Sequence, residues 1–498
     1  MKDIRYSSTR GEKEQVLSSE AILRGLAGDG GLYFPEEIPT LDAEWKKLAE
    51  MNYREVAFEV MKRFLTDYTE EELHYCIDHA YDDKFETDVI APLAYADGAY
   101  YLELYHGKTI AFKDMALSIL PYLLTCAAKK HQITDEIVIL TATSGDTGKA
   151  ALAGFADVPG TRIIVFFPED GVSPIQKKQM VTQKGANTFV VGVHGNFDDC
   201  QTNVKKMFSD AALKEKMLEK GFRFSSANSI NIGRLIPQVA YYVYAYAKLL
   251  ENEKIQEGEA INIVVPTGNF GNILAAYLAK QMGLPVHRLI CASNDNRVLT
   301  DFFLSGTYDK KDRAFRITTS PSMDILVSSN LERMVYVACG RDPERTAALM
   351  ASLTKEGLYS LTEEERKGLS DYAAGCATEA EVAEEIADVF HKTGYVMDTH
   401  TAVGSRVYRK YKEETKDEAV TVIASTASPF KFTRAVLTAI DPAYGNEADD
   451  LKLADQLAAV SNMPIPAAIE EIRTAPVLHR TVCETGDMKK TVETYLGL

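Results

Sequence analysis

The sequence predicts an α/β protein with two lobes, each built on a parallel sheet covered by helices, and a mainly helical N-terminal region. Short β-branched apolar runs recur from residue 136 onward, and helical patterns separate most of them. Unalternated runs of this kind are typical of parallel strands buried on both faces. The length of 498 residues agrees with this division, because a chain of this size forms roughly two to four domains.

The first 92 residues form the predicted helical region. A loop-rich opening that contains GLAGDGGLYFPEEIP comes first. Between residues 53 and 81 apolar residues recur at helical spacing, with acidic residues between them. We therefore assign residues 1–92 to helices that pack beside the α/β lobes.

Six apolar runs predict the buried strands: EIVILTAT, TRIIVFFPE, NTFVVGVHG, INIVVPTG, HRLICASN and AVTVIAST. The first three fall in residues 131–224, which we assign to a smaller α/β lobe. The other three belong to a larger lobe formed by residues 93–130 and 225–445. Residues 446–498 have a helical pattern and are expected to form an extension that wraps the larger lobe.

One helix of the smaller lobe has both of its ends marked in the sequence. Ser173 is a suitable cap, Pro174 suits the first helical turn, and Gly185 is a suitable stop. These signals predict a helix that begins at Pro174 and ends close to Gly185.

The composition argues against several classes of function. A net charge of −17 opposes general binding to nucleic acids or to anionic membranes, which need a basic face. The seven cysteines and nine histidines show no metal-ligand spacing, and the unpaired cysteines suit a reducing compartment. The chain opens without an apolar signal core and has no run of membrane-spanning length. We therefore expect a cytoplasmic protein without a metal site.

Lys113 stands in an unusual place within HGKTIAFKDMALSIL, residues 106–120. It lies at the start of a predicted helix, where the partial positive charge of the helix end disfavours an ammonium group. An imine with an aldehyde cofactor would remove that charge. The alternative is a solvated lysine whose neighbour Asp114 compensates the helix dipole.

Two glycines after the fourth strand suit a phosphate group. Ligands of open α/β sheets bind beyond the carboxyl ends of the strands, and TGNFGN lies at such an end before a helix. Gly268 and Gly271 allow close approach of the backbone, and the helix end supplies free N–H groups, so we expect neither glycine to accept a side chain without loss of cofactor. The alternative is a plain turn. The spacing does not match the dinucleotide fingerprint, and the stretches SGDTGKA and HGKT do not match a P-loop.

Two further strand ends carry small polar residues. In SGDTGKA the hydroxyl and amide groups suit a carboxylate, while Thr143 or Ser144 also suits a helix cap. In TASPFKF, Ser428 is a suitable cap before Pro429. Thr426 is either an ordinary strand-end residue or a hydroxyl that faces a site.

The ordered set HGKTIAFKD, SGDTG, GNFGN and STASPFKF resembles the threonine synthases, pyridoxal-phosphate enzymes of the tryptophan-synthase-β fold (fold type II). The stretches YSSTRG, SSANSINIGRL and DTHTAVG are similar to the longer bacterial and fungal forms. Together these motifs span about residues 6–432. The chain departs from the usual family pattern at three positions, where Lys108 and Thr399 replace prolines and Ser428 replaces a histidine.

The resemblance implies a role for each motif. Lys113 would bind pyridoxal phosphate as a Schiff base and act as general base. The other implied cofactor contacts are Phe112, Asp146, Gly268, Asn269, Phe270, Gly271, Asn272 and Thr426. The implied substrate contacts are Thr143, Ser144, Gly145 and Thr147 for a carboxylate, and Ser229, Asn231 and Arg234 for a phosphate. Relatives with SGNTG-type loops have an asparagine at the position of Asp146, and we expect the Asp146 carboxylate to turn away from the cofactor and cap its helix.

The implied reaction converts O-phosphohomoserine and water into threonine and phosphate, in a monomer or homodimer. Two alternatives stay open. A serine/threonine dehydratase or cysteine-synthase-like enzyme would share the cofactor site but would need no phosphate-binding arginine. A non-catalytic protein that binds phosphorylated metabolites would keep GNFGN but would have no use for Lys113.

Overall fold

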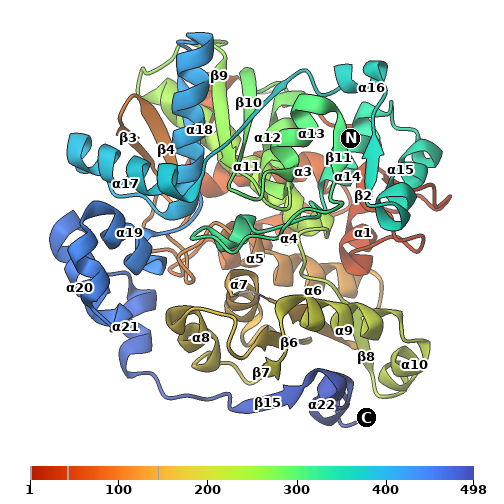
Figure 1. Cartoon of the computed structure of the whole chain (residues 1–498). Coiled ribbons are helices and arrows are strands. Elements are labelled where there is room, and N and C mark those ends of the chain that lie inside the picture. The colour runs from red at the N-terminus through yellow and green to blue at the C-terminus, as the bar shows by residue number, and fades with distance from the viewer. Residues whose placement is uncertain (1–2, 42–43, 144) are drawn as a thin grey trace.

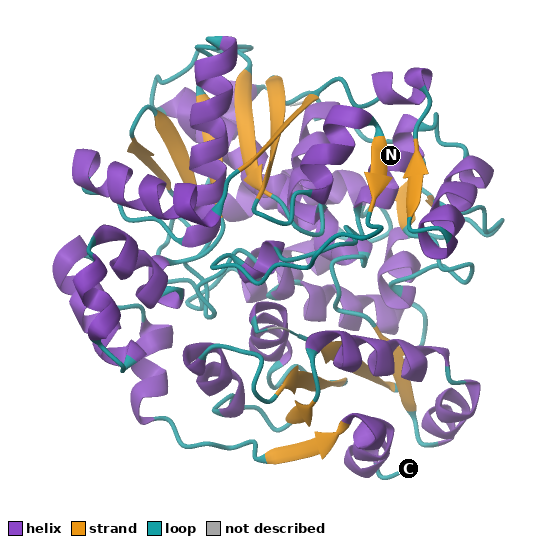
Figure 2. Cartoon of the chain, in the orientation of Figure 1, coloured by secondary structure: helices purple, strands orange, loops and turns teal. Residues whose placement is uncertain are grey.

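The computed structural model describes residues 3–41, 44–143 and 145–498, and its two larger sheets lie in separate lobes (Figures 1 and 2). The larger sheet has the strand order β13-β10-β9-β14-β4-β3, and all of its pairs are parallel except β3–β4. Its strands are β3 (Leu93–Ala96), β4 (Ala99–Glu103), β9 (Ile261–Pro266), β10 (Val286–Ser293), β13 (Tyr372–Cys376) and β14 (Thr421–Ser425). Asp97 and Gly98 join β3 to β4 with positive φ angles, as a tight hairpin requires.

The smaller sheet is wholly parallel, in the order β15-β7-β6-β5-β8. Its strands are β5 (Glu136–Ala142), β6 (Thr161–Pro168), β7 (Thr188–His194), β8 (Phe222–Ser225) and β15 (Thr481–Glu484). Each of the six predicted runs contains one strand of the expected lobe, so the α/β prediction is confirmed.

The N-terminal region is helical, as predicted, apart from the two-stranded pair β1 (Tyr6–Ser8) and β2 (Tyr33–Pro35). Its helices are α1 (Ser18–Arg24), α2 (Trp45–Ala49), α3 (Tyr53–Phe64) and α4 (Glu70–Ala80). Capping boxes formed by Asn52 with Glu55 and by Thr69 with Glu72 fix the starts of α3 and α4. Apolar side chains of α3 and α4 share one core with the larger lobe, so the described residues of this region form no separate core.

The larger lobe surrounds its sheet with helices, of which α11 is buried along almost its whole length, as an apolar sequence on every face requires. Its helices are α5 (Asp114–Leu117), α6 (Leu120–Lys130), α11 (Ile232–Glu251), α12 (Gly271–Gln281), α13 (Val298–Ser305), α14 (Leu331–Ala338), α15 (Pro343–Lys355), α16 (Glu363–Lys367), α17 (Glu379–Thr393), α18 (Thr399–Thr415) and α19 (Thr433–Ile440). Short strands β11 (Thr307–Asp309) and β12 (Leu358–Ser360) pair beside α13, and 3-10 turns occur at η1 (Pro321–Met323), η2 (Pro429–Lys431) and η3 (Pro442–Asn446).

The smaller lobe carries α7 (Asp146–Phe155), α8 (Pro174–Val181), α9 (Phe197–Ser209) and α10 (Ala211–Glu219). Helix α8 begins as predicted, because the Ser173 hydroxyl accepts from the Gln176 N–H and the Gln176 side chain closes the capping box. It ends at Val181, before the expected stop at Gly185, which instead has a positive φ in the following turn.

Residues 446–498 are mainly helical and reach the larger lobe as expected, but they also join the smaller lobe, which was not predicted from the sequence. Helix α20 (Asp450–Ser461) packs against α19, and both α20 and α21 (Ala467–Thr474) pack against α8 of the smaller lobe. The chain then adds β15 to the edge of the smaller sheet, and the 3-10 turn η4 (Thr485–Asp487) leads into α22 (Met488–Leu496), whose apolar face closes that lobe's core. A four-residue edge strand among polar residues carries too little apolar pattern to be recognised from sequence.

Truncation of a buried side chain in α22 tests this assignment. Met488→Ala should lower the free energy of unfolding by about 2–5 kcal/mol, because the fully buried Met488 fills the core of the smaller lobe. Urea unfolding followed by circular dichroism measures the change. Lys490→Ala, an exposed position on the same helix, should stay within about 0.5 kcal/mol. Equal stability of the two variants would show that α22 is not part of the core.

Candidate active site

Lys113 is largely buried at the start of α5, so the alternative of a solvated lysine is wrong. Its side chain is 12% exposed, and its Nζ donates to the Ser322 Oγ over 3.1 Å and lies 3.6 Å from the Asp146 Oδ2. Burial lowers the pKa of Lys113 to about 8, with help from the charges of Lys431 and Arg234 and against the pull of Asp146. The amine is therefore partly neutral at neutral pH, as a nucleophile or general base requires.

The loop before Lys113 is fixed to the end of β14. The Asp114 carboxylate is buried and accepts from the Thr109 N–H over 2.8 Å and from the Thr109 hydroxyl over 2.6 Å. The Phe112 N–H donates to the Thr426 carbonyl over 2.8 Å. Asp114 therefore fixes the conformation of the loop at Thr109, a role beyond compensating a helix dipole. Lys108, in the same loop, is exposed to solvent.

Asp146 is the first residue of α7, but its side chain does not cap that helix, and the capping expectation is wrong. Its Oδ1 lies 2.9 Å from the Nζ of Lys431, a fully buried lysine that needs a counter-ion. The same oxygen accepts from the Gln176 amide, and the Oδ2 accepts from the Ser322 hydroxyl, each over 2.9 Å. Burial alone would raise the pKa of Asp146, but the nearby cationic groups, first Lys431 and then Lys113, hold it well below its usual range.

Thr143 holds the loop before α7. Gly145 is the N-cap residue of α7, so the expectation of Thr143 at that position is wrong, but the Thr143 hydroxyl still accepts from the N–H groups of Gly145 and Gly148 over 3.0 and 2.9 Å. Gly145 has a φ of 132°, which only glycine adopts easily. Thr147 is half-buried in the first turn, and Ser144 lies outside the residues that the structure describes.

The TGNFGN loop follows β9 and leads into α12 at Gly271. A Cβ at Gly268 would lie 2.5 Å from the Ser322 carbonyl oxygen, so this position excludes any side chain. A Cβ at Gly271 would lie 3.4 Å from the Asn330 Nδ2, an ordinary contact. Phe270 has a φ of 64°, which is strained for an aromatic residue and is typical of functional loops.

Two buried amides beside this loop keep their NH₂ groups unpaired. The Asn272 Oδ1 accepts from the hydroxyls of Tyr241 and Tyr242, and the Asn330 Oδ1 accepts from the Arg333 guanidinium. Both amides are therefore oriented with their Nδ2 groups free of partners among the described residues. Each unpaired buried donor costs about 1–3 kcal/mol, and a bound anion removes that cost. These donors and the glycine loop fit a phosphate group.

The NSINIGR stretch supplies one free cation. Arg234 is buried, and its Nη1 donates to the Ala227 carbonyl while its Nε has no partner in the described part of the chain. Burial lowers the pKa of Arg234 to about 10. The expectation that Asn231 contacts a ligand is wrong, because its amide caps α11 through the Gly233 N–H and donates to two carbonyls. Ser229 is half-buried, and its role stays a prediction.

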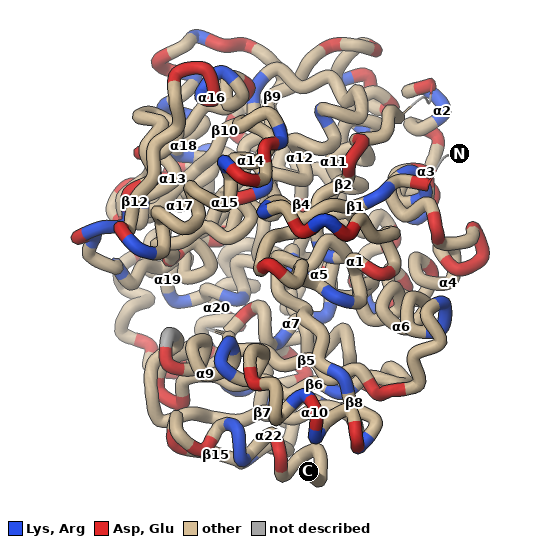
Figure 3. The backbone as a smooth tube through the Cα atoms, turned by 90° about the vertical axis from the view of Figure 1, so that its right-hand side faces the viewer, with Lys and Arg blue, Asp and Glu red and all other residues tan. Residues whose placement is uncertain are grey.

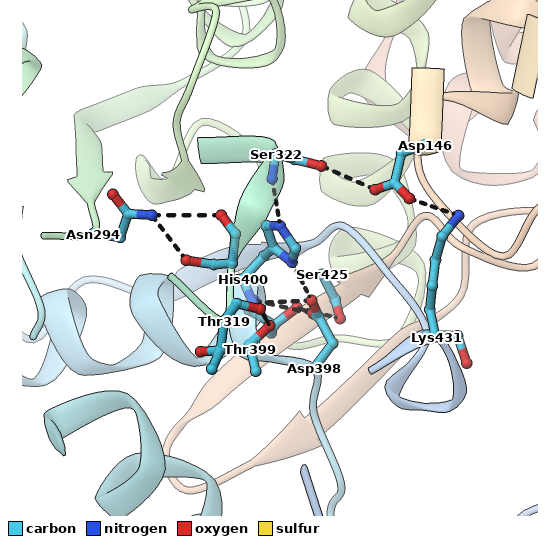
Figure 4. A network of polar contacts seen from close by, with 12 residues as sticks. Asp146, Asn294, Thr319, Ser322, Asp398, Thr399, His400, Ser425 and Lys431 are labelled. Carbon is cyan, nitrogen blue, oxygen red and sulfur yellow. Dashed lines mark hydrogen bonds and ion pairs between the residues drawn. The ribbon is translucent and has the colours of Figure 1, made fainter. Parts of the chain in front are cut away.

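Thr426 lies directly after β14 and is buried, while the Ser428 hydroxyl caps the turn η2, as predicted. Residues that the sequence reasoning missed complete the site (Figure 4): Ser322, Lys431, Asp398 and His400. Lys431 lies in the strand-end stretch TASPFKF, where only Thr426 and Ser428 were considered, and His400 lies in a motif noticed for the resemblance alone. Ser322 falls in an irregular segment without any sequence signal. No group of three or more His, Cys, Asp or Glu side chains in the described ranges is arranged to bind a metal ion.

Three family models match the chain. The model described as pyridoxal-phosphate dependent enzyme matches residues 93–426, which contain Lys113, the 268–272 loop and Thr426. The fold and the site thus define a pyridoxal-phosphate-dependent enzyme. The models described as threonine synthase N terminus and threonine synthase, C-terminal match residues 5–81 and 401–475. The chain belongs to the threonine synthase family.

Individual relatives agree with this assignment. The chain is 38% identical to the threonine synthase of Pseudomonas aeruginosa over 442 residues, which cover 87% of the chain and 90% of that protein. It is 39% identical to the threonine synthase-like 1 protein of Homo sapiens over 449 residues, 87% of the chain, and spans about 59% of that protein's length. The PLP-bound threonine synthase of Brucella melitensis has a TM-score of 0.87 and 37% identity, over 99% of this chain and 98% of that one.

The two glycines of the loop should respond differently to a methyl group. Gly268→Ala forces its Cβ against the Ser322 carbonyl, so we expect loss of cofactor and a loss of about 1–3 kcal/mol in unfolding free energy. Gly271→Ala should fold normally, and any loss of cofactor there reports crowding of the bound phosphate alone. Visible absorbance and thermal unfolding measure both properties. A Gly268→Ala protein with full stability would contradict the packing described above.

The Asp146–Lys431 pair can be tested by removing its charges one at a time. Asp146→Asn leaves the buried Lys431 without its counter-ion and should cost about 3–5 kcal/mol of unfolding free energy. Adding Lys431→Met should recover most of that loss, because the uncompensated charge is gone. Urea unfolding of the cofactor-free variants measures both values. An Asp146→Asn protein as stable as the parent would show that the pair is not needed to hold Lys431.

Proposed function

We propose that this chain converts O-phosphohomoserine and water into threonine and phosphate with pyridoxal phosphate as cofactor. The observation that carries the proposal is an excess of buried positive charge and unpaired donors around one carboxylate. Lys113 and Lys431 lie beside Asp146, the buried Arg234 is close enough to Lys113 to lower its pKa, and the unpaired amides are those of Asn272 in the 268–272 loop and of Asn330 beside it. The 268–272 loop is sufficient to bind one phosphate, that of the cofactor. The buried guanidinium of Arg234 provides a second anion-binding position, which supports a second phosphate on the substrate.

The cofactor would be held by groups from three strand ends. Lys113 would bond to its aldehyde, the 268–272 loop with Asn330 would hold its phosphate, and Thr426 would face the ring nitrogen. When bound, the cofactor supplies an electron sink that stabilises negative charge next to the amino group of the substrate. Asp146 would lie on the ring's oxygen side, where Lys431 and Ser322 already compensate its charge.

Lys113 would carry the proton transfers once the substrate amine has released it. A pKa of about 8 leaves a useful fraction of the amine neutral near pH 7.5, so it can take a proton from the substrate's α-carbon. Loss of a second proton, from the β-carbon, then allows the phosphate group to leave the γ-carbon; later water adds at the β-carbon while protons return to the γ- and α-carbons. The rate should therefore rise with pH until the amine is largely neutral.

Substrate anions would be held by two opposing elements. The N-terminus of α7, with Thr143, Gly145 and Thr147, offers amide groups and a positive helix end to the carboxylate. Arg234 offers a forked guanidinium to the phosphate, with Ser229 nearby in the same loop. The surrounding protein has a net charge of −17, spread over both lobes (Figure 3), so these local cations are needed to attract a dianion.

The free Arg234 favours this reaction over that of a serine/threonine dehydratase, whose substrate carries no phosphate. We also infer that the enzyme is of fold type II and works in the cytoplasm as a monomer or homodimer. The seven free thiols support a reducing compartment. None of the described helices has both the length and the apolar character of a membrane span.

Purified protein incubated with O-phosphohomoserine tests the proposal directly. We expect release of inorganic phosphate together with an equal amount of threonine, measured by a phosphate assay and by chromatography. Formation of a keto acid and ammonia from serine or threonine, with no reaction of phosphohomoserine, would assign the chain to the dehydratases. Absence of any visible cofactor band would favour the non-catalytic binder.

Arg234 variants test the second phosphate position. Arg234→Ala should lose about 2–5 kcal/mol of interaction with the phosphorylated substrate, the range for removing one partner of a buried charge pair. Arg234→Lys should recover only part of it, because a point charge does not reproduce the fork. The value of kcat/KM for phosphohomoserine, beside the rate at which the bound cofactor reacts with serine, measures the effect. Equal losses on both substrates would make Arg234 a structural residue.

A further inference from the structure

Ser322 occupies a position between the charged groups of the site that the proposed mechanism leaves unused. It lies in the turn η1 of the larger lobe, within the irregular segment that joins β11 to α14. Its hydroxyl accepts from the Lys113 Nζ over 3.1 Å. It donates to the Asp146 Oδ2 over 2.9 Å (Figure 4). Its carbonyl packs against Gly268 of the glycine loop.

The backbone of Ser322 is fixed by a buried histidine. The Ser322 N–H donates to the His400 Nε2 over 3.2 Å, so this ring nitrogen carries no proton. The His400 Nδ1 therefore holds the ring hydrogen and donates it to the Asp398 Oδ2 over 2.7 Å. His400 and Asp398 are buried at the start of α18, where the Thr399 hydroxyl also binds the Thr319 carbonyl. The turn is thus attached to α18 at two points.

We propose that Ser322 is a catalytic residue that orients the amine of Lys113, and that His400 is a positioning residue that acts through Ser322. The inference rests on the proposed function, because it concerns the amine after the substrate has released it. Since the Ser322 hydroxyl has one hydrogen and gives it to Asp146, only its lone pairs face Lys113. Lys113 must therefore donate an N–H to Ser322, which turns the amine's own lone pair away from Ser322 and leaves it free to accept a substrate proton.

The hydroxyl also bridges Lys113 and Asp146, whose Nζ and Oδ2 lie 3.6 Å apart in a loose ion pair. A closer, hydrogen-bonded ion pair would favour the ammonium form more strongly, and that form cannot act as a base. The charged groups that face Lys113 are Asp146 from α7, Lys431 from η2 and Arg234 from α11, and His400 faces Asp146 from α18. Among these only Asp146 favours the ammonium form, so Ser322 stands beside the one group that would disable the base. No proton leaves Ser322 during the cycle.

Ser322→Ala in the cofactor-loaded enzyme tests the proposal. We expect kcat to fall about 10-fold or more with little change in KM, because the base is misoriented. The acid limb of the kcat profile should move to higher pH by about half a unit or more, because Lys113 then faces Asp146 directly. Ser322→Thr, which keeps the hydroxyl, should restore both. Cofactor content and the pH dependence of the visible band of the resting enzyme are recorded for every variant.

His400 variants separate positioning from general stability. His400→Gln keeps an acceptor for the Ser322 N–H and should retain the pH profile, whereas His400→Leu should shift it in the direction of Ser322→Ala. Thr319→Ala, an exposed hydroxyl three residues away in the same segment, is the matched control and should change nothing.

The outcomes are distinct. If the parent protein does not convert phosphohomoserine, the proposed function fails. If the parent does so and Ser322→Ala keeps both kcat and the acid limb, the role of Ser322 is overturned. If Ser322→Ala fails to fold, an unchanged pH profile in His400→Leu, with full cofactor content, overturns the proposal instead.

Discussion

The buried contact between Asp146 and Lys431 is the constraint on which the site depends. Asp146 comes from the first turn of α7 in the smaller lobe, and Lys431 comes from the turn after β14 in the larger one. Neither charge is tolerated at this depth without the other, so the two lobes are fixed relative to each other at this point. Buried pairs of this kind add little net stability, but they specify one arrangement, and here that arrangement brings Lys113 and Ser322 to the same carboxylate.

The remaining positive charge explains why the site needs ligands. Asp146 forms ion pairs with Lys431 and Lys113, whereas Arg234 forms none with any described residue. Unpaired amides of Asn272 and Asn330 add hydrogen-bond donors that no protein group satisfies within the described ranges. Burying such groups without partners is costly in an empty protein. Two bound phosphates, one of the cofactor and one of the substrate, would supply the missing partners, and the relief of this unfavourable free energy would contribute to their binding.

Much of the architecture was predictable because it follows local rules. Buried parallel strands are short apolar runs, and the capping residues Ser173 and Ser428 act at the positions that their sequence context indicates. The glycine loop was also predictable, because Gly268 and Gly271 stand between an apolar strand and a helix in the sequence itself. The predictions that were wrong concern residues whose partners are distant in the sequence. Whether Asp146 caps α7 or pairs with Lys431 is decided by a residue 285 positions away, as their numbers give (431 minus 146).

Other misses have the same physical origin. The motif of Asn231 predicted a contact with the substrate, but its side-chain amide donates a hydrogen bond to the carbonyl of Ile22 in the N-terminal region. Ser322 lies in a segment without periodicity and gains its meaning only when the turn reaches His400 and Lys113. The strand β15 is recognisable only once β7 offers an edge to pair with. Local sequence therefore predicted most strands, caps and turns, whereas the hydrogen-bond and strand partners of these residues depend on tertiary contacts.

The central claim is that Lys113 is the amine which this buried cluster prepares for the cofactor. Borohydride reduction of the purified, cofactor-loaded protein, followed by peptide mapping with mass spectrometry, tests it most directly. The account predicts a reduced pyridoxyl group on Lys113 alone, in the peptide that contains TIAFKDMA. A reduced group on Lys431 or Lys149, with Lys113 unmodified, would contradict the account.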